Sequence, residues 1–205
     1  MSSRIAILDY GMGNLRSVEK AFEKVGADCL RTRVSDQILA AAGLVLPGVG
    51  AFPRAMARIR ELGWDRLITD RVQAGVPVLG ICLGYQLLFE RSSEFGGDRG
   101  LDLIEGEVTE LEATGLKLPH IGWEPVRWQR KSPLIDGLGG ETAFYFVHSL
   151  APRPAGEDCL GTAVYGSGFA AAAQSGNVFG VQFHPEKSSE AGLRLLANFT
   201  AICDS

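Results

Sequence analysis

Short apolar segments alternate with longer amphipathic stretches in the first half of the chain. The apolar runs predict buried strands, at residues 5–8, 27–31, 43–46 and 76–81. The amphipathic stretches predict helices, at residues 15–25, 52–62 and 64–74. Because strands that alternate with helices usually pair in parallel, we expect a mostly parallel central sheet with helices on both faces, an α/β fold.

The pattern changes from about Gly106, where short strand-like runs follow one another without helices between them. These runs are residues 107–112, 125–127, 142–147, 159–165, 170–173 and 178–183. We expect some of them to be antiparallel, as a short mixed extension of the main sheet. An amphipathic stretch at residues 188–201 predicts a closing helix, with Ser188 or Ser189 as its N-cap.

The strand at residues 76–81 leads into Gly80-Ile81-Cys82-Leu83-Gly84-Tyr85-Gln86, and a helix is expected over residues 85–90. Cys82 therefore stands at a tight strand–turn–helix junction, the nucleophile-elbow pattern with Cys in place of Ser. Glycines flank it because side chains there would clash. The first amides of the helix favour a thiolate and, later, an oxyanion. Taken alone, the segment also fits a buried structural cysteine.

A candidate base follows the last predicted strand, residues 178–183. His184 stands at its carboxyl end, Pro185 stops the ladder, and Glu186 follows two positions after the histidine. A nucleophile, a histidine and a carboxylate that orients it form a catalytic triad. Carboxyl ends of parallel strands lie at one edge of a sheet, so Cys82 and His184 are expected to meet there. Without Cys82, His184 would read as a hydrogen-bonded strand-end histidine.

The other two histidines are rival bases. His120 precedes a turn and lacks an adjacent carboxylate, so we expect a structural or interface residue. His148 follows the aromatic segment Phe144-Tyr145-Phe146 and is expected to anchor a loop near the site.

Further blocks resemble those of a known family. They are Asp9-Tyr10-Gly11-Met12-Gly13-Asn14, Pro47-Gly48-Val49-Gly50-Ala51-Phe52, Pro119-His120-Ile121-Gly122-Trp123, Tyr145-Phe146-Val147-His148-Ser149 and His184-Pro185-Glu186-Lys187-Ser188-Ser189. With the elbow, they resemble class I (triad) glutamine amidotransferases, and among these the glutaminase subunits of imidazole glycerol phosphate synthase. The resemblance runs from about residue 4 to about residue 200. It implies the flavodoxin-like α/β fold of that class, and the length predicts one domain over residues 1–205.

The resemblance implies a glutaminase reaction. The Cys82 thiolate would attack the side-chain amide carbon of glutamine, His184 would shuttle protons, and Glu186 would orient His184. The backbone amide of Leu83 is the expected first donor to the oxyanion. The second is expected from the Gly48-Val49-Gly50 turn, with Val49 as the donor, and the resemblance implies that this turn must reorganise.

Four positions match the family's contacts to substrate glutamine: Gln86, Glu94, Gly48 and Ser149. Glu94 would accept from the substrate ammonium, although a solvated surface carboxylate also fits its sequence context. Leu150 and Glu124 depart from the family pattern, so no side-chain contact is carried over to them.

The chain has no Walker motif and no Gly-x-Gly-x-x-Gly fingerprint, so nothing in it indicates a site for a phosphorylated sugar-nucleotide. A single glutaminase domain without such a site implies that the ammonia acceptor is on another polypeptide. The resemblance implies a heterodimer with the cyclase subunit, a (β/α)8 barrel. That subunit would use the ammonia to make imidazole glycerol phosphate and AICAR. We expect Asn14, Arg16 and Trp123 at the interface, and no cofactor.

Composition and charge argue against several other classes of protein. A net charge of −4 without a basic cluster argues against nucleic-acid binding. No apolar run is long enough to span a membrane, and Met1-Ser2-Ser3-Arg4-Ile5 lacks the features of a signal peptide. Four widely spaced cysteines, Cys29, Cys82, Cys159 and Cys203, predict free thiols in the cytoplasm and no zinc site.

Three alternatives stay open at this point. The chain could be a class I glutaminase for another acceptor, such as a surface-sugar or pyridoxal phosphate pathway. It could be a cysteine hydrolase or peptidase on a similar scaffold, against which Gln86 and the order His184-Pro185-Glu186 argue. It could also be a binding module that keeps the elbow only as scaffold.

Overall fold

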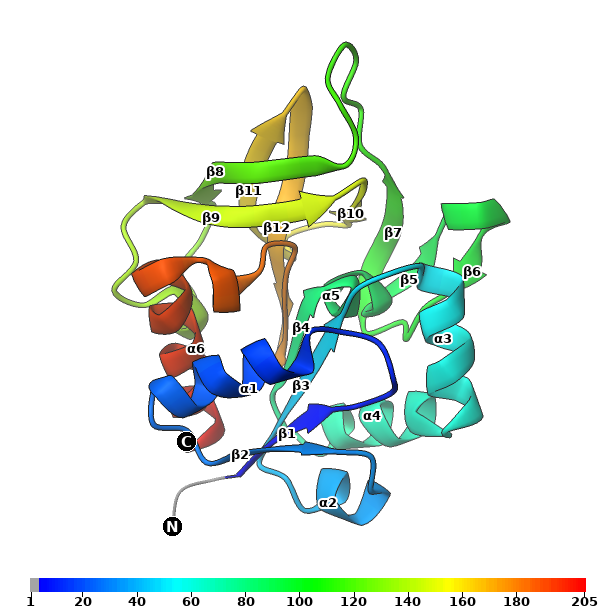
Figure 1. The fold of residues 1–205 in the computed structure, drawn as a ribbon, viewed down its shortest axis with the longest axis vertical. Helices are drawn as coiled ribbons and strands as arrows, with labels where there is room; N and C mark the ends of the chain where they lie inside the picture. The colour runs from blue at the N-terminus through cyan, green and yellow to red at the C-terminus, as the bar shows by residue number, and fades with distance from the viewer. Residues whose placement is uncertain (1–3) are drawn as a thin grey trace.

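The structure, a computed structural model, describes residues 4–205 (Figure 1). Met1, Ser2 and Ser3, which contributed to the signal-peptide prediction, lie outside the described residues. The α-helices are α1 (Leu15–Lys24), α2 (Ser35–Leu39), α3 (Phe52–Glu61), α4 (Trp64–Gln73), α5 (Leu83–Leu87) and α6 (Ser189–Cys203). Short 3-10 turns are η1 (Glu94–Gly96), η2 (Pro133–Ile135) and η3 (Pro185–Lys187). Within the described residues, no helix is both long and apolar enough to cross a bilayer.

A 9-stranded sheet forms the centre of the molecule, in the order β2-β1-β3-β4-β13-β12-β11-β8-β9. Its parallel part consists of β2 (Cys29–Thr32), β1 (Ile5–Leu8), β3 (Gly43–Gly48), β4 (Val78–Cys82) and β13 (Val178–Val181). Its antiparallel part continues through β12 (Ser167–Ser175), β11 (Cys159–Tyr165), β8 (His120–Trp128) and β9 (Glu141–His148). The expected α/β fold is confirmed, and the antiparallel extension is longer than expected.

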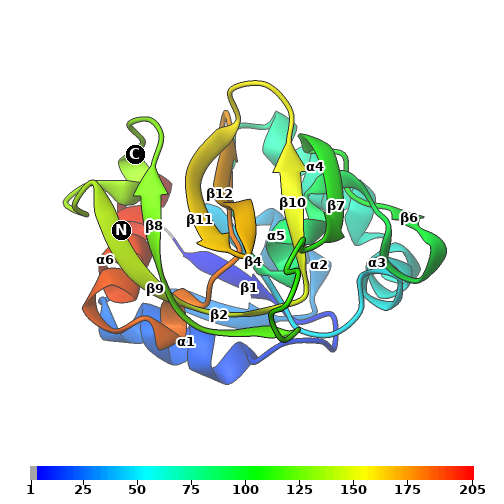
Figure 2. The same cartoon turned by 90° about the horizontal axis from the view of Figure 1, so that it is seen from above.

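A second, 4-stranded sheet stands beside the first, in the order β10-β7-β5-β6. It contains β10 (Leu150–Pro154), β7 (Ile104–Glu110), β5 (Phe89–Ser92) and β6 (Asp98–Arg99). Strand β10 follows His148 and Ser149 directly, so this sheet brings the end of β9 toward the elbow. Figure 2 shows β10 and β7 next to α5.

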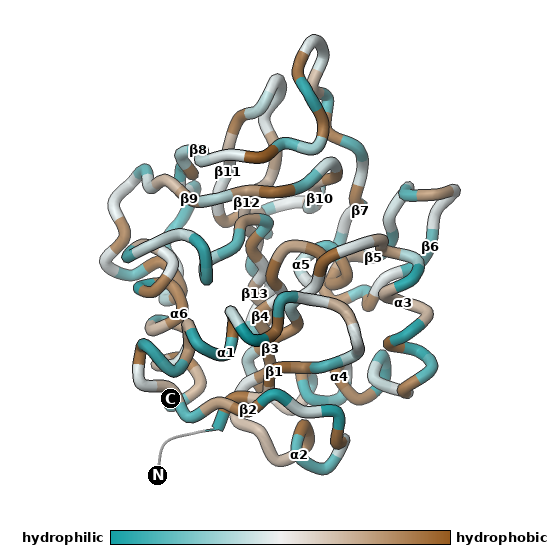
Figure 3. Tube along the Cα trace, viewed as in Figure 1, coloured by the Kyte–Doolittle hydropathy of each residue, from teal (hydrophilic) through white to brown (hydrophobic). Residues whose placement is uncertain are grey.

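Helices cover both faces of the parallel strands, as expected. Along β1, Ile5 and Ile7 pack in a core with Phe22 of α1 and Phe199 of α6, whereas Ala6 and Leu8 face a second core. The second core contains side chains from α2, α3, α4 and α5. The alternation follows from the pleat of a strand, which points successive side chains to opposite faces. Buried strands at the centre of the molecule are accordingly hydrophobic along their length (Figure 3).

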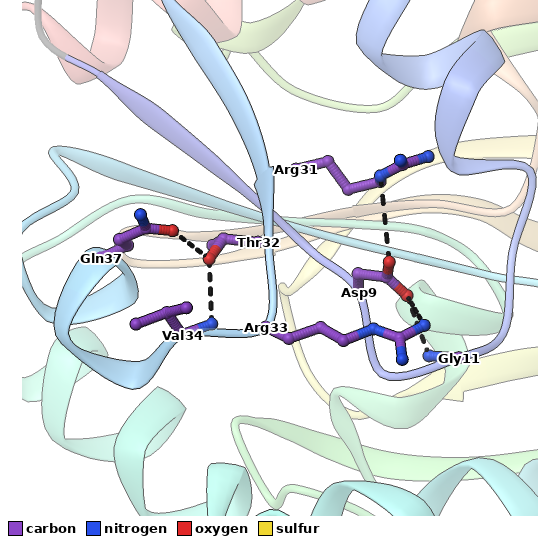
Figure 4. Close-up of polar contacts among 7 residues, drawn as sticks. All are labelled: Asp9, Gly11, Arg31, Thr32, Arg33, Val34 and Gln37. Carbon is purple, nitrogen blue, oxygen red and sulfur yellow. Dashed lines mark hydrogen bonds and ion pairs between the residues drawn. The ribbon is translucent and has the colours of Figure 1, made fainter.

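Polar contacts hold the carboxyl ends of β1 and β2 together (Figure 4). The Asp9 carboxylate accepts from the Arg33 guanidinium at 3.0 Å and from the Gly11 amide at 3.2 Å. Arg31 lies 3.8 Å from the same carboxylate. The hydroxyl of Thr32 accepts from the Val34 amide at 2.9 Å and contacts Gln37. These contacts fix the turn that precedes α1 and the entry into α2.

Two expectations about local structure need correction. The helix predicted over residues 85–90 ends at Leu87, and Phe89 begins strand β5, which pairs with β6 and β7. The aromatic Phe89 is buried in the second sheet, and tertiary pairing there overrides helix continuation. Ser188 does occupy the N-cap of α6, but its hydroxyl donates to the His184 carbonyl and accepts from the Tyr145 amide instead of capping the helix.

Close packing of α5 on the sheet leads to the first prediction. A β-carbon on Gly84 would collide with the Leu46 carbonyl. Gly84→Ala should therefore lower the free energy of unfolding by about 3 kcal/mol, measured by urea denaturation. Gly140→Ala is the matched control, because a β-carbon at that position would have no atom within 4 Å and its φ is unstrained. Equal stability of the two variants would contradict this view of the elbow.

Candidate active site

Cys82 ends β4 in a conformation that non-glycine residues rarely adopt. Its φ is 55° and its ψ is −111°, and α5 begins at the next residue. The turn is possible because glycines flank it: a β-carbon on Gly80 would lie 2.7 Å from the Gly84 carbonyl oxygen. The structure thus contains the predicted strand–turn–helix elbow, with Cys82 as its strained residue.

Parallel pairing of β13 with β4 brings the predicted base to the elbow. The register aligns Val181 with Ile81, so the segment that follows β13 runs beside Cys82. His184 lies in this segment, three residues after the end of β13, and its backbone amide donates to the Tyr145 carbonyl at 2.9 Å. Its ring Nδ1 lies 2.9 Å from Glu186 Oε1, and the two side chains are 6% and 1% exposed.

The electrostatics of His184 depend on its two partners. Burial is the largest influence and would lower its pKa, but Cys82 and Glu186 outweigh it and raise the pKa to about 10. The second carboxylate oxygen of Glu186 is buried and has no hydrogen-bond partner among the described residues. His184 is therefore held as a cation-favouring imidazole between a thiol and a carboxylate.

A cavity of about 290 Å³ opens over the elbow, which is close to the lower end of small-molecule sites. Residues from both sheets line it: Val49, Gly50, Cys82, Leu83, Gln86, Glu94, Pro119, Val147, His148, Ser149, Leu150, His184 and Lys187. Most of the predicted site residues are thus brought together. Glu186 stands behind His184. Gly48 lies outside the lining, where a β-carbon would meet the Tyr10 hydroxyl and Leu83.

Two predicted substrate contacts already have partners in the structure. The Gln86 amide nitrogen donates to the Leu150 carbonyl at 3.1 Å and to Gln182 Oε1 at 3.0 Å. The carboxylate of Glu94 accepts from the Phe52 amide at 2.6 Å, at the first turn of α3. Both hydrogens of the Gln86 NH2 group are thus used, whereas the Glu94 carboxylate keeps lone pairs for a further donor.

His148, which lines the cavity, forms a buried pair with His120. His148 Nδ1 lies 2.8 Å from the Leu150 carbonyl, and His120 Nδ1 lies 3.1 Å from His148 Nε2. Burial lowers the pKa of His148 to about 4, and it also lowers the pKa of His120, although Glu124 opposes this. Because the Leu150 oxygen can only accept, neutral His148 carries its proton on Nδ1 and accepts from His120. This agrees with the expectation that His148 anchors a loop near the site.

Sequence reasoning missed Gln182, which is fully buried. Its amide nitrogen lies 3.8 Å from Cys82 Sγ. The signal that could have revealed it is a polar residue inside an otherwise apolar strand-like run, residues 178–183.

All four cysteines are free, as expected. Among residues 4–205, no group of three or more His, Cys, Asp or Glu side chains is arranged to hold a metal ion.

Comparison with known proteins agrees with this geometry. The family model "Glutamine amidotransferase class-I" matches residues 6–203. The imidazole glycerol phosphate synthase subunit HisH of Moorella thermoacetica is 53% identical over 95% of this chain and 93% of its own length. The HisH subunit of Salinibacter ruber is 48% identical over 96% of this chain and 93% of its own length.

Solved structures show the same fold at low sequence identity. A crystal structure titled as a glutamine amidotransferase superimposes with a TM-score of 0.78 at 20% identity, covering 98% of this chain and 99% of the other. PurLQS from Thermotoga maritima gives 0.78 at 19% identity, with the same coverage. With a family model over nearly all of its length and relatives near 50% identity, the chain belongs to the class I glutamine amidotransferases, in the family of imidazole glycerol phosphate synthase HisH subunits.

Proposed function

We propose that this chain hydrolyses glutamine to glutamate and ammonia and delivers the ammonia to the cyclase subunit of imidazole glycerol phosphate synthase. One observation carries the proposal: a cysteine on a strained elbow shares a cavity with His184, which is hydrogen-bonded to Glu186 at 2.9 Å. We further propose that residues 1–205 form one glutaminase domain. It would work in the cytoplasm, where thiols such as Cys82 stay reduced.

The proposed reaction proceeds through a thioester. Cys82 Sγ forms a bond to the side-chain carbonyl carbon of glutamine, and the carbonyl electron pair moves to oxygen. His184 receives the thiol proton and donates it to the leaving nitrogen, so that ammonia departs. Water then adds to the γ-glutamyl thioester, again with His184 as base, and glutamate and the thiol are released. Glu186 orients His184 and stabilises its cationic form.

Two backbone amides are proposed as donors to the oxyanion. The Leu83 amide belongs to the first residue of α5, directly after Cys82. The second donor is proposed to be Val49, with Gly50 supplying the freedom of the turn at a φ of 110°. This turn lies next to the elbow because Gly48 of β3 pairs with Cys82 of β4.

The rest of the cavity is proposed to bind the glutamine head group and side chain. The free oxygens of Gln86 and Glu94 can accept from the substrate's amide and ammonium nitrogens. Ser149 lines the cavity. Gly48 lies next to the lining, and its lack of a side chain leaves space for the Tyr10 hydroxyl.

The ammonia acceptor follows from the relatives, which are named as subunits of imidazole glycerol phosphate synthase. We propose a heterodimer with a (β/α)8 barrel cyclase that releases imidazole glycerol phosphate and AICAR. Trp123 is 50% exposed on β8, and Asn14 and Arg16 are also exposed, which supports their proposed place at the interface. The relatives' names do not favour the other acceptor pathways.

The role of Cys82 predicts a specific loss of activity. Cys82→Ala should reduce glutamate release by at least about 10³-fold, because no other group can form the thioester. Circular dichroism should show an unchanged fold. Cys159→Ala is the matched control, since this half-buried thiol on β11 lies outside the cavity lining. Activity of Cys82→Ala near that of the wild type would refute the triad.

The shift of the His184 pKa from its ordinary value should reverse direction when both of its partners are removed. Cys82 and Glu186 raise this pKa, whereas burial lowers it. Glu186→Gln should lower the pKa of His184, and Cys82→Ala with Glu186→Gln should bring it below the ordinary value of 6.5, because only burial remains. Nuclear magnetic resonance of the three histidines measures this directly. A His184 pKa that stays high in the double variant would show that other groups hold the charge.

The proposed partner predicts stimulation. Glutamate release should rise strongly when the cyclase subunit and its nucleotide ligand are added to the wild-type chain. Trp123→Ala should weaken the stimulation, whereas Leu39→Ala, on α2 at the opposite end of the molecule from β8, should not (Figure 1). Hydrolysis that this partner cannot stimulate would assign the chain to another ammonia acceptor.

A further inference from the structure

A continuous chain of buried hydrogen bonds ends at the Cys82 sulfur. It runs from the Leu150 carbonyl through the side chains of Gln86 and Gln182. Gln86 is 6% exposed and Gln182 is 0% exposed. Buried amides need partners for both of their ends, so this chain determines which atom of each amide faces the sulfur.

The orientation of both amides follows from one backbone carbonyl. The Leu150 oxygen can only accept, so the Gln86 atom 3.1 Å away is its NH2 group. The same NH2 lies 3.0 Å from Gln182, which must therefore present its oxygen there. The NH2 group of Gln182 is left facing Cys82 Sγ at 3.8 Å. A flipped Gln182 would set two donors against each other at Gln86.

The Leu150 carbonyl is itself held in place. It also accepts from His148 Nδ1 at 2.8 Å, so both of its lone pairs are used. His148 is in turn held by His120 at 3.1 Å. The NH2 group of Gln182 is therefore directed at the sulfur by contacts that reach into β8, β9 and β10.

The sulfur of Cys82 has two competing backbone and side-chain partners. The Val147 carbonyl, also 3.8 Å away, can only accept, so it interacts favourably with the thiol S–H. The Gln182 NH2 can only donate, so it interacts favourably with a thiolate. The titratable side chains that share the cavity with this sulfur are Glu94, His148, His184 and Lys187. Tyr10, after β1, also interacts electrostatically with Cys82.

We propose that Gln182 is a further catalytic residue, which stabilises the Cys82 thiolate by donating a hydrogen bond whose direction is fixed through Gln86 and the Leu150 carbonyl. The proposal rests on the proposed function for its role in glutamine hydrolysis. Its effect on the thiol can be measured without glutamine.

The test is the pH dependence of Cys82 alkylation by iodoacetamide, followed by mass spectrometry of the peptide that carries Cys82. Gln182→Met keeps the approximate volume and removes the donor. It should move the midpoint of the alkylation profile upward by about one pH unit, which is about a tenfold loss of thiolate at pH values below that midpoint. With glutamine, kcat should fall about tenfold, because the donor acts on the nucleophile, whereas a change in KM would report the contact to Gln86 that Gln182→Met also removes.

Two further variants separate this role from a purely structural one. Gln182→Glu keeps an acceptor for Gln86, removes the donor and places an acid beside the sulfur, so it should raise the Cys82 pKa more than Gln182→Met does. It also provides the test if Gln182→Met fails to fold. Gln174→Met, on the neighbouring strand β12, is the matched control, because the Gln174 amide donates to the Gly176 carbonyl and not toward Cys82.

The outcomes distinguish this inference from the proposed function. An unchanged Cys82 pKa in both Gln182 variants, with kcat intact, would overturn the role of Gln182 and leave the glutaminase proposal standing. A raised Cys82 pKa in a chain whose wild type releases no glutamate, even with the cyclase subunit and its nucleotide ligand, would support the role of Gln182 toward the thiolate and refute glutamine as the substrate.

Discussion

The site depends on how closely α5 can approach the sheet beneath it. Gly80 and Gly84 bring the elbow together, and Gly180 of β13 leaves space for the Tyr85 ring, which a β-carbon there would strike. Because Gly180 has no side chain, β13 can pair with β4 in the observed register while the ring packs against it. That register carries the chain past Cys82 and on to His184. The strained cysteine, its base and the cavity thus depend on one tightly packed layer, in which glycines let backbone and ring atoms occupy the space that side chains would otherwise fill.

Charge is distributed unevenly among the histidines around the cavity. His184 lies between a thiol and a carboxylate, which raise its pKa, whereas His148 and His120 are kept neutral by burial. The neutral pair holds the Leu150 carbonyl, and the titrating histidine faces the sulfur. One imidazole is thereby available to exchange protons, while the other two serve as fixed hydrogen-bonding elements that do not compete for the same proton.

Much of this could be read from the sequence, and the failures have physical causes. Strands β1 and β11 were predicted with their observed bounds. Cys82 and His184 share one cavity, as expected from strand ends at one sheet edge, and Glu186 contacts His184. Helix α2 and strand β6 were missed because they are short, and strand β10 because Pro152 and Pro154 argue against a strand. The pairing of β6 and β10 is decided by distant segments.

The polar contacts around the site were harder to foresee. The spacing of Gln86 from Cys82 indicated a substrate contact, but its NH2 group is committed to Leu150 and Gln182, which lie 64 and 96 positions away in the chain. Gly48, a predicted substrate contact, lies against the Tyr10 hydroxyl, where a β-carbon would not fit. Such assignments depend on which donors and acceptors meet across the fold, and no local pattern in the sequence records that.

The left-handed backbone of Cys82 has an evolutionary consequence. A φ of 55° disfavours every residue with a β-carbon, and glycine would adopt it with less strain. Selection for a more stable fold alone would therefore tend to erase the nucleophile at this position. At this position the residue that suits the backbone best and the residue that the reaction needs are therefore different, and a chain that keeps cysteine here accepts local strain in exchange for reactivity.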